Sequence, residues 1–248
     1  MKVQALLLSG WMAAAVPGTA AGAQTYFPDT ITFSGATQTQ DQLLAFTRLH
    51  PGRVTKDEMQ AASDRLVATG LFSDVRYTLN DAVLQFTLTP SPAVLPVRYD
   101  NFPWWDDKTL NALIAEKVPL FGGALYPGGP MRQQVSDVLE GLLAEKGVKA
   151  KVSTTPVADA QGTMIATRYH IDSPPVLIAS LTVEGASDAW AAEMRRVEES
   201  AAGKDFRGAT RDSLAAEIRR VYANHGVLSV EMAGPTWGPP KVVDGKIL

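Results

Sequence analysis

The chain has 248 residues, of which 46% are hydrophobic and 20% are charged, as in an ordinary soluble globular protein. Its net charge of -3 gives no basic excess, which argues against a nucleic-acid partner. The absence of cysteine excludes disulfide bonds, zinc–thiolate sites and thiol nucleophiles. The length allows one large domain or two to three small ones.

The first 23 residues have the layout of a secretory signal peptide. Lys2 supplies the positive start, a mostly apolar run follows from Val3 to Val16, and Ala21-Gly22-Ala23 forms an A-x-A cleavage site. We therefore expect an exported, mature protein that begins at Gln24; the alternative, a buried N-terminal helix, fits this layout less well. No later segment has the roughly 20 apolar residues that a transmembrane helix needs.

Residues 24–90 predict a first module that begins with an alternating strand around Ile31 and Phe33. A short helix follows, and a second helix begins in a capping box formed by Thr55 and Glu58 and ends at Gly70. The next residues alternate in two runs separated by a turn at Asn80-Asp81, which predicts a hairpin. The apolar positions of the two runs are Val75, Tyr77 and Leu79, then Leu84, Phe86 and Leu88.

Residues 91–173 predict a second module of the same order. Its first strand covers 95–99, its second helix ends at Gly147, and its last two strands cover 148–152 and 164–171. A glycine- and proline-rich loop at 121–130 separates the two helices. Its glycine spacing is similar to that of a phosphate loop, but Gly129-Pro130 replaces the Lys-Ser/Thr pair, so a flexible inter-helix loop is the better interpretation.

Residues 174–248 predict a third module, with strands at 178–183 and 227–232 and two helices between them, the second ending at Gly226. Its closing strand, within 241–248, is weak, and we expect the chain to stop before this module is complete. The linkers at 89–92 and 173–175 are short and rich in proline, which predicts limited hinging between modules.

The three segments together predict an α+β protein of tandem β-α-α-β-β modules, each a three-stranded mixed sheet backed by two helices. The glycines that end the second helices lie 77 and 79 residues apart, a period that suits tandem small domains better than a solenoid. The alternative is a coincidence of common βααβ patterns. The glycines that mark strand and helix ends are Gly35, Gly70, Gly147, Gly185 and Gly226.

This order resembles the POTRA domain, the polypeptide-transport-associated module of outer-membrane assembly and translocation factors. The most specific part is Gly70-Leu71-Phe72-Ser73-Asp74-Val75, which follows a helix and matches a "G-[LFY]-[FY]-x-x-V" pattern. The third module matches in outline through 222–228, and the second departs from the pattern by its long loop.

The resemblance implies a non-enzymatic periplasmic scaffold or chaperone-like arm, associated with the outer membrane, in outer-membrane protein assembly or secretion. Its implied partners are unfolded or extended outer-membrane polypeptides and an outer-membrane β-barrel or lipoprotein. A small sheet leaves edge strands whose unpaired backbone groups can bind a client as an added strand. The expected binding edges carry Val75, Tyr77 and Leu79 in the first module, and Val148, Ala150 and Val152 in the second.

The other candidate chemistry is weak. We expect no metal site and no cofactor, because His50, His170 and His225 are distributed one to a module and are interpreted as surface or turn residues; His170 and Asp172 could share a strand face, but two ligands are too few. No G-x-S-x-G elbow occurs, and no carboxylate pair favours acid–base catalysis.

The adjacent Trp104 and Trp105 allow two interpretations. They could bind a sugar or a partner chain, in which case the alternative function is an envelope carbohydrate-binding protein or enzyme centred on this segment. The favoured interpretation is structural: one tryptophan covers the core, while Asp106 or Asp107 caps the helix that follows.

Overall fold

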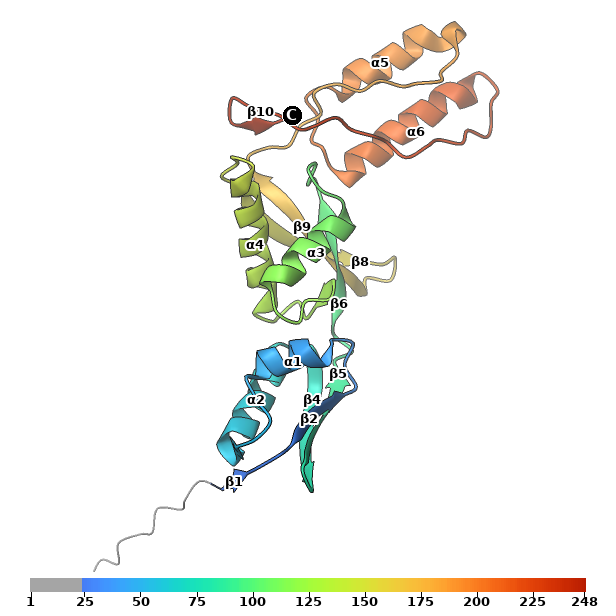
Figure 1. Cartoon of the computed structure of the whole chain (residues 1–248). Helices are drawn as coiled ribbons and strands as arrows, with labels where there is room; N and C mark the ends of the chain where they lie inside the picture. Colours follow the sequence, from blue (N-terminus) through green and yellow to red (C-terminus); the bar gives the residue numbers. More distant parts are fainter. Residues whose placement is uncertain (1–23) are drawn as a thin grey trace, which may run out of the picture.

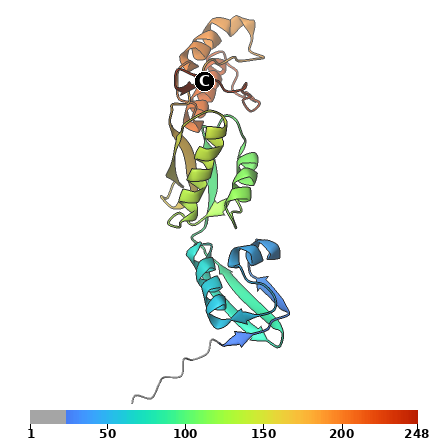
Figure 2. The same ribbon diagram turned by 60° about the vertical axis from the view of Figure 1, so that its left-hand side comes forward.

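The computed structural model describes residues 24–248, so the predicted signal peptide of residues 1–23 lies outside the described part of the chain. Helices and strands are both present, which confirms the α+β class. The elements fall into successive groups along an elongated molecule (Figures 1 and 2). We call residues 24–90, 91–173 and 174–248 modules 1, 2 and 3, using the boundaries expected from the sequence.

Module 1 has the predicted β-α-α-β-β order with one additional short strand pair, β1 with β3. Its elements are β1 (Thr25–Tyr26), β2 (Thr30–Ser34), α1 (Gln40–Thr47), β3 (Val54–Thr55), α2 (Lys56–Ala68), β4 (Phe72–Asn80) and β5 (Val83–Pro90). The sheet order is β2-β5-β4, so the last strand in sequence lies in the centre. β5 runs parallel to β2 and antiparallel to β4.

Local sequence accounts for these elements. The backbone N–H of Thr55 donates to Glu58 Oε2 at 2.7 Å and the backbone N–H of Glu58 donates to Thr55 Oγ1 at 3.2 Å, so the predicted capping box starts α2. On β5, the alternating Leu84, Phe86 and Leu88 are all buried against the helices, while the residues between them are exposed.

Module 2 repeats this order around a four-stranded sheet, β7-β6-β9-β8. Its elements are β6 (Leu95–Asp100), α3 (Asp107–Lys117), β7 (Ala124–Leu125), α4 (Met131–Glu145), β8 (Lys151–Ala158) and β9 (Met164–Ser173). The central pair again runs parallel, β6 with β9, and β8 pairs antiparallel with β9. The fourth strand, β7, comes from the loop at 121–130, so part of the segment predicted as a flexible inter-helix loop pairs with β6.

The strand predicted at 148–152 begins later, at Lys151. Gly147 adopts φ 79°, its N–H donates to the carbonyl oxygen of Ala144, and the N–H of Val148 donates to that of Leu143. These two bonds form the Schellman arrangement that ends a helix, with Val148 buried as its apolar contact. The prediction was wrong here because Val148, although in phase with the strand, belongs to the helix end.

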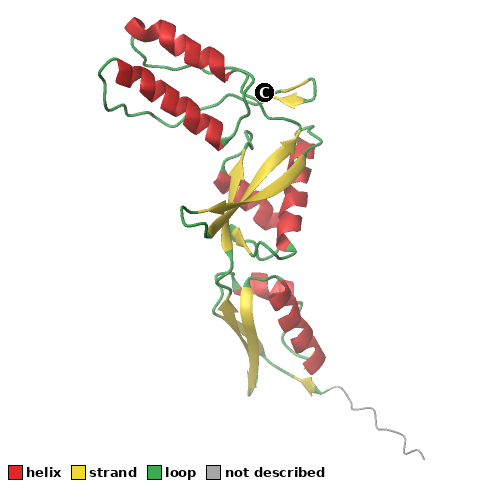
Figure 3. Cartoon of the chain, turned by 180° about the vertical axis from the view of Figure 1, so that it is seen from behind, coloured by secondary structure: helices red, strands yellow, loops and turns green. Residues whose placement is uncertain are grey.

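Module 3 keeps the two predicted helices but lacks the predicted sheet. Its elements are the 3₁₀ turn η1 (Asp188–Trp190), α5 (Ala191–Ala201), α6 (Gly208–Asn224), β10 (Val242–Val243) and β11 (Lys246–Ile247). Residues 178–183 and 227–232 form no strand, as the loops beside the helices in Figure 3 show. In modules 1 and 2 the central strand has eight and ten residues, whereas only the two residues of β11 lie in that position in module 3. The flanking segments therefore have almost nothing to pair with.

The buried side chains form two clusters. The larger spans modules 1 and 2 and also includes Val176 and Ile247; the smaller lies between α5 and α6 and contains Met194, Val197 and Leu214. Modules 1 and 2 thus share a continuous apolar core that extends to Val176 and Ile247 of module 3, and the two helices of module 3 have a separate one. Within residues 24–248, no helix combines the length and hydrophobicity needed to cross a bilayer.

Candidate functional site

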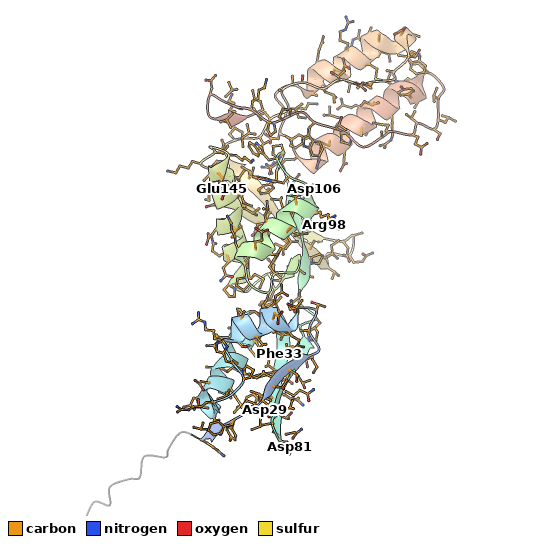
Figure 4. The ribbon with its side chains drawn as sticks, in the orientation of Figure 1. Asp29, Phe33, Asp81, Arg98, Asp106 and Glu145 are labelled. Carbon is orange, nitrogen blue, oxygen red and sulfur yellow. The ribbon has the colours of Figure 1, made fainter. Side chains whose placement is uncertain are left out.

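The outer edge of β4 carries the first group of predicted binding residues. Asn80 and Val83 pair across the two-residue turn whose tip, at Asp81, is visible in Figure 4. In such a hairpin the flanking pair is hydrogen-bonded and every second residue repeats that arrangement. The N–H and C=O groups of Val75, Tyr77 and Leu79 therefore point away from β5, towards the free edge.

The side chains of Val75, Tyr77 and Leu79 do not lie on an open surface. All three are half-buried and pack against the larger core cluster, and the rings of Tyr77 and Phe86 lie 5.6 Å apart. A partner at this edge would contact their main chain first. Among the described residues, one outward group is already bonded, because the Ser63 hydroxyl donates to the carbonyl oxygen of Val75 at 3.4 Å.

The opposite edge of the same sheet, β2, is blocked at Phe33 by a side chain. The amide nitrogen of Gln40 donates to the carbonyl oxygen of Phe33 at 2.6 Å, and the backbone N–H of Phe33 donates to Gln40 Oε1 at 2.9 Å. The Gln40 side chain thus occupies both groups as a neighbouring strand would. Sequence reasoning missed this residue, since a glutamine in the first turn of a helix has no distinctive pattern.

The outer edge of β8, the second predicted binding site, also has fewer free main-chain groups. Glu140 of α4 accepts a hydrogen bond from the backbone N–H of Val152 at 2.9 Å. Since alternate residues of a strand face the same edge, Thr154 and Pro156 follow on this side, and Pro156 has no N–H to donate. Val148 lies outside the strand and Ala150 precedes it, so of the three predicted residues only Val152 lies on β8.

The contacts of Ser63 and Glu140 are equivalent in the two modules. Each residue lies seven positions before the glycine that ends its helix, and each contacts the strand residue five positions after that glycine. Ser63 bonds a main-chain acceptor, the carbonyl oxygen of Val75, whereas the Glu140 carboxylate bonds a main-chain donor, the N–H of Val152. The structure therefore leaves β4 as the more open of the two predicted edges.

Trp104 and Trp105 lie together at the start of α3, with ring centroids 5.8 Å apart. Both are half-buried and pack against the larger core cluster, and the Lys146 ammonium lies 5.7 Å from the Trp105 ring centroid. Asp106 is the N-cap, because its Oδ1 accepts from the backbone N–H of Thr109 at 2.7 Å. These contacts agree with the structural interpretation of the segment.

The histidines differ in their surroundings. His170 is buried on β9, 3.5 Å from Asp172, so its expected surface location was wrong although the shared strand face is present. His225 stacks on Trp190 at a centroid distance of 4.8 Å and lies 3.1 Å from Glu193. Among the described residues, no group of three or more acidic, histidine or cysteine side chains is arranged to hold a metal ion.

No protein-family model matches the sequence, and no curated protein matches it. Among solved structures, the chain is similar to the N-terminal domain of Omp85 from Thermosynechococcus elongatus, with 16% identity, a TM-score of 0.31 and coverage of 90% of this chain and 94% of that one. It is also similar to BamA POTRA3-5 of Haemophilus influenzae, with 14% identity, a TM-score of 0.26 and coverage of 94% and 96%. CdiB from Escherichia coli matches over 65% of this chain and 30% of its own, with 17% identity and a TM-score of 0.23.

The topology of modules 1 and 2 can be compared with the β-α-α-β-β order that the sequence predicts. Modules 1 and 2 both contain a strand, two helices and a closing hairpin, and in both the first strand runs parallel to the last. Each of the signature glycines expected from the repeat adopts a positive φ, between 73° and 83°. The β-α-α-β-β order by which the sequence resembles tandem POTRA domains is thus present in full in modules 1 and 2.

Proposed function

We propose that this chain is a periplasmic scaffold that binds extended polypeptides during outer-membrane protein assembly or secretion, and that clients add as a strand to the outer edge of β4. The observation that carries this proposal is the contrast between edges. β2 is blocked at Phe33 by Gln40 and β8 is blocked at Val152 by Glu140, with Pro156 lacking an N–H, whereas no described residue bonds the outward main-chain groups of Tyr77 and Leu79 on β4.

The chemistry of this edge suits varied clients. Main-chain hydrogen bonds give affinity that depends little on client sequence, which is what a scaffold for many polypeptides requires. The exposed side chains between the outward groups, Arg76 and Thr78, are polar and tolerate solvent when no client is present. The POTRA resemblance and the signal-peptide layout of the sequence support the periplasm as the compartment. We propose no catalytic role, and the partner barrel or lipoprotein stays part of this proposal.

The test is a residue-resolved NMR titration of the purified chain with an extended outer-membrane strand peptide. The expected result is that amide signals of residues 75–80 shift most and that their hydrogen exchange slows. Shifts confined to other surfaces, or none up to millimolar peptide, would reject binding at β4.

Two variants of Leu79 distinguish the contribution of its main-chain N–H to peptide binding from that of its side chain. Leu79→Pro removes an outward N–H that no described residue uses, and proline is tolerated on an edge strand when its nitrogen faces solvent. Leu79→Ala keeps the N–H and removes most of the side chain. We expect Leu79→Pro to weaken binding more than Leu79→Ala, because only proline removes the N–H.

A further inference from the structure

A cavity of about 420 Å³ lies at the junction of modules 2 and 3. Its walls come from β6, β9 and the start of α3 in module 2, and from the first turn of α6 in module 3. Figure 4 labels Arg98 and Asp106 at this end of module 2. The lining contains four arginines and three aspartates, which is a net charge of +1 in a chain whose net charge is -3. The junction is therefore a locally positive site on an acidic protein.

Three of the four arginine side chains have no partner within residues 24–248. Arg98 and Arg168 lie directly opposite each other on β6 and β9, and Arg207 immediately precedes α6. The described residues give these three guanidinium groups no ion pair and no hydrogen bond. Like charges on directly opposite residues of neighbouring strands disfavour their pairing. An anion between the guanidinium groups would remove that cost.

The fourth arginine and the start of α6 already bind a carboxylate of module 2. Asp100 Oδ1 accepts from the backbone N–H of Gly208 at 2.8 Å and lies 3.9 Å from Arg211 Nη2. This contact joins the two modules and satisfies an amide of the first turn of the helix. The free binding capacity of the cavity therefore lies in the three unpaired guanidinium groups and not in the helix terminus.

The other two carboxylates of the lining do not pair with these arginines. Burial, followed by repulsion from Asp106, raises the pKa of Asp107, while Arg211 and Arg98 lower it. The charge of Arg98 thus reaches Asp107, but no nitrogen–oxygen distance between a described arginine and this carboxylate is within 4 Å. Asp212 is exposed on α6. Neither aspartate uses the N–H donors of the three guanidinium groups.

Tyr99 adds a main-chain donor and acceptor at the same cavity. The backbone N–H of Val97 donates to the carbonyl oxygen of Gly123 at 2.9 Å, on the side of β6 that faces β7. Since alternate residues of a strand face the same edge, the N–H and C=O of Tyr99 also point away from β9, beyond the end of β7. No described residue bonds them. A polypeptide at this cavity can therefore use main-chain hydrogen bonds as well as side-chain charge.

We propose that the junction of modules 2 and 3 binds an acidic side chain of a polypeptide partner through the guanidinium groups of Arg98, Arg168 and Arg207. The charge balance selects the anion. One carboxylate neutralises the excess of +1, whereas a phosphate group, with a charge of about -1.5 to -2, would overcompensate it. Guanidinium groups also match the two oxygens of a carboxylate. The inference rests on the proposed function only in taking a polypeptide as the ligand, and it adds a charge preference and a second site.

The probe is the N-acetylated, C-amidated peptide Thr-Val-Glu-Val-Thr, and its control is the same peptide with Gln in place of Glu. Both have the same main chain, so binding at β4 should not distinguish them. An NMR titration of the purified chain follows the amide signals of residues 98–100 and 207–212. We expect the Glu peptide to shift these signals with a dissociation constant about tenfold lower than that of the Gln peptide, equivalent to about 1.4 kcal/mol. Added salt should reduce this difference.

Arg98→Gln and Arg168→Gln test the guanidinium groups themselves. Each variant removes one of two opposing charges, so we expect the thermal unfolding of the free chain to be unchanged or to occur at a slightly higher temperature. Each should also raise the dissociation constant of the Glu peptide about tenfold and remove its advantage over the Gln peptide. Arg195→Gln is the matched control, because Arg195 is exposed on α5 and forms no ion pair within the described chain.

Three outcomes would overturn this inference. Shifts confined to residues 75–80 with both peptides would support the proposed function and reject the junction. Equal binding of the two peptides at the junction, or binding unchanged in Arg98→Gln and Arg168→Gln, would exclude recognition of the carboxylate by these arginines. Inorganic phosphate that shifts the same amides at lower concentration than the Glu peptide would assign the site to another anion. Shifts confined to the junction with the Glu peptide would support this inference and count against β4.

Discussion

The ring of Tyr126 fills the space that Gly70 leaves by having no side chain. A Cβ atom on Gly70 would lie 2.6 Å from Tyr126 Cδ1, far inside van der Waals contact. Gly70 ends α2 in module 1, and Tyr126 lies in the loop between α3 and α4 of module 2. This contact, together with the hydrogen bond from Gln38 Nε2 to the carbonyl oxygen of Leu120 at 3.1 Å, joins the two modules.

Gly70→Ala is therefore expected to destabilise the protein in two ways. Gly70 has φ 73°, a conformation that costs an L-residue about 1 kcal/mol or more, and the added methyl group displaces the Tyr126 ring, for which overpacking costs about 1–3 kcal/mol. We expect the free energy of unfolding, measured by urea denaturation, to fall by about 2–4 kcal/mol.

Gly162→Ala is the control for the backbone cost, because Gly162 has φ 83° and an added Cβ would meet nothing within 4 Å. Adding Tyr126→Ala to Gly70→Ala should relieve the steric part, so the two losses should be less than additive. If Gly70→Ala cost no more than Gly162→Ala, the contact between the modules would not be tight.

Gln40→Ala should open the second edge of the module 1 sheet. The substitution leaves the backbone N–H and C=O of Phe33 without their side-chain partner, and an unsatisfied, partly buried polar group costs about 1–3 kcal/mol. We expect a loss of this size in thermal or urea unfolding and new peptide-induced NMR shifts at β2. Gln60→Ala is the control, since Gln60 is exposed and bonds only Asp64, so it should change stability by less than about 0.5 kcal/mol. If the peptide induced the same NMR shifts in Gln40→Ala as in the wild type, the Gln40 side chain would not be what keeps peptides from β2.

Asn101→Ala should be among the more costly substitutions in module 2. The buried Asn101 donates from Nδ2 to the carbonyl oxygen of Ile171 at 3.0 Å and accepts from the Ile171 N–H at 2.7 Å, which extends the pairing of β6 with β9. Its φ of 56° adds a backbone penalty for alanine but not for glycine. We expect a loss of about 2–4 kcal/mol for alanine, from two unsatisfied groups and the backbone. Asn101→Gly should lower the free energy of unfolding by about 1 kcal/mol less than Asn101→Ala does. Equal losses in the two variants would show that the lost hydrogen bonds alone, and not the backbone conformation, determine the effect.

The sequence could predict the elements whose signals are local. Thr55 and Glu58 lie three residues apart, so the capping box was readable, and the alternation of Leu84, Phe86 and Leu88 identified a half-buried strand. Such signals depend on neighbouring residues and on the period of one element.

The sequence could not predict features that depend on which elements become neighbours. Glu140 blunts β8 only because α4 lies beside it, and Gln40 closes β2 only because α1 folds back over Phe33. Module 3 shows the same limit at the level of a sheet. The alternation at 227–232 is intact, but a strand also requires a partner, and the central position of module 3 holds only β11. An alternating pattern alone carries no information about whether a neighbouring strand is present.

Acid should weaken the starts of α2 and α3. The backbone hydrogen bond from Thr55, followed by the bond with its hydroxyl, lowers the pKa of Glu58 below its ordinary value. Hydrogen bonds with Thr109 likewise lower the pKa of Asp106, whose position at the start of α3 is shown in Figure 4. The pKa of Asp107 is shifted in the opposite direction: burial, followed by repulsion from Asp106, raises it above its ordinary value.

For Glu58 and Asp106 the folded pKa is lower than the unfolded one, so their stabilising effect is complete above the ordinary values near about 4 and is lost as the pH falls through the folded values. Glu58→Gln and Asp106→Asn keep an acceptor oxygen but cannot titrate. We expect the melting temperature of each variant to fall less steeply than that of the wild type between about pH 5 and pH 2.5, where the capping carboxylates become protonated. Asp107→Asn serves as the contrasting variant, since removing a carboxylate with a raised pKa should steepen the net loss in acid. A wild-type slope unchanged by Glu58→Gln and Asp106→Asn would show that these caps do not determine the acid response.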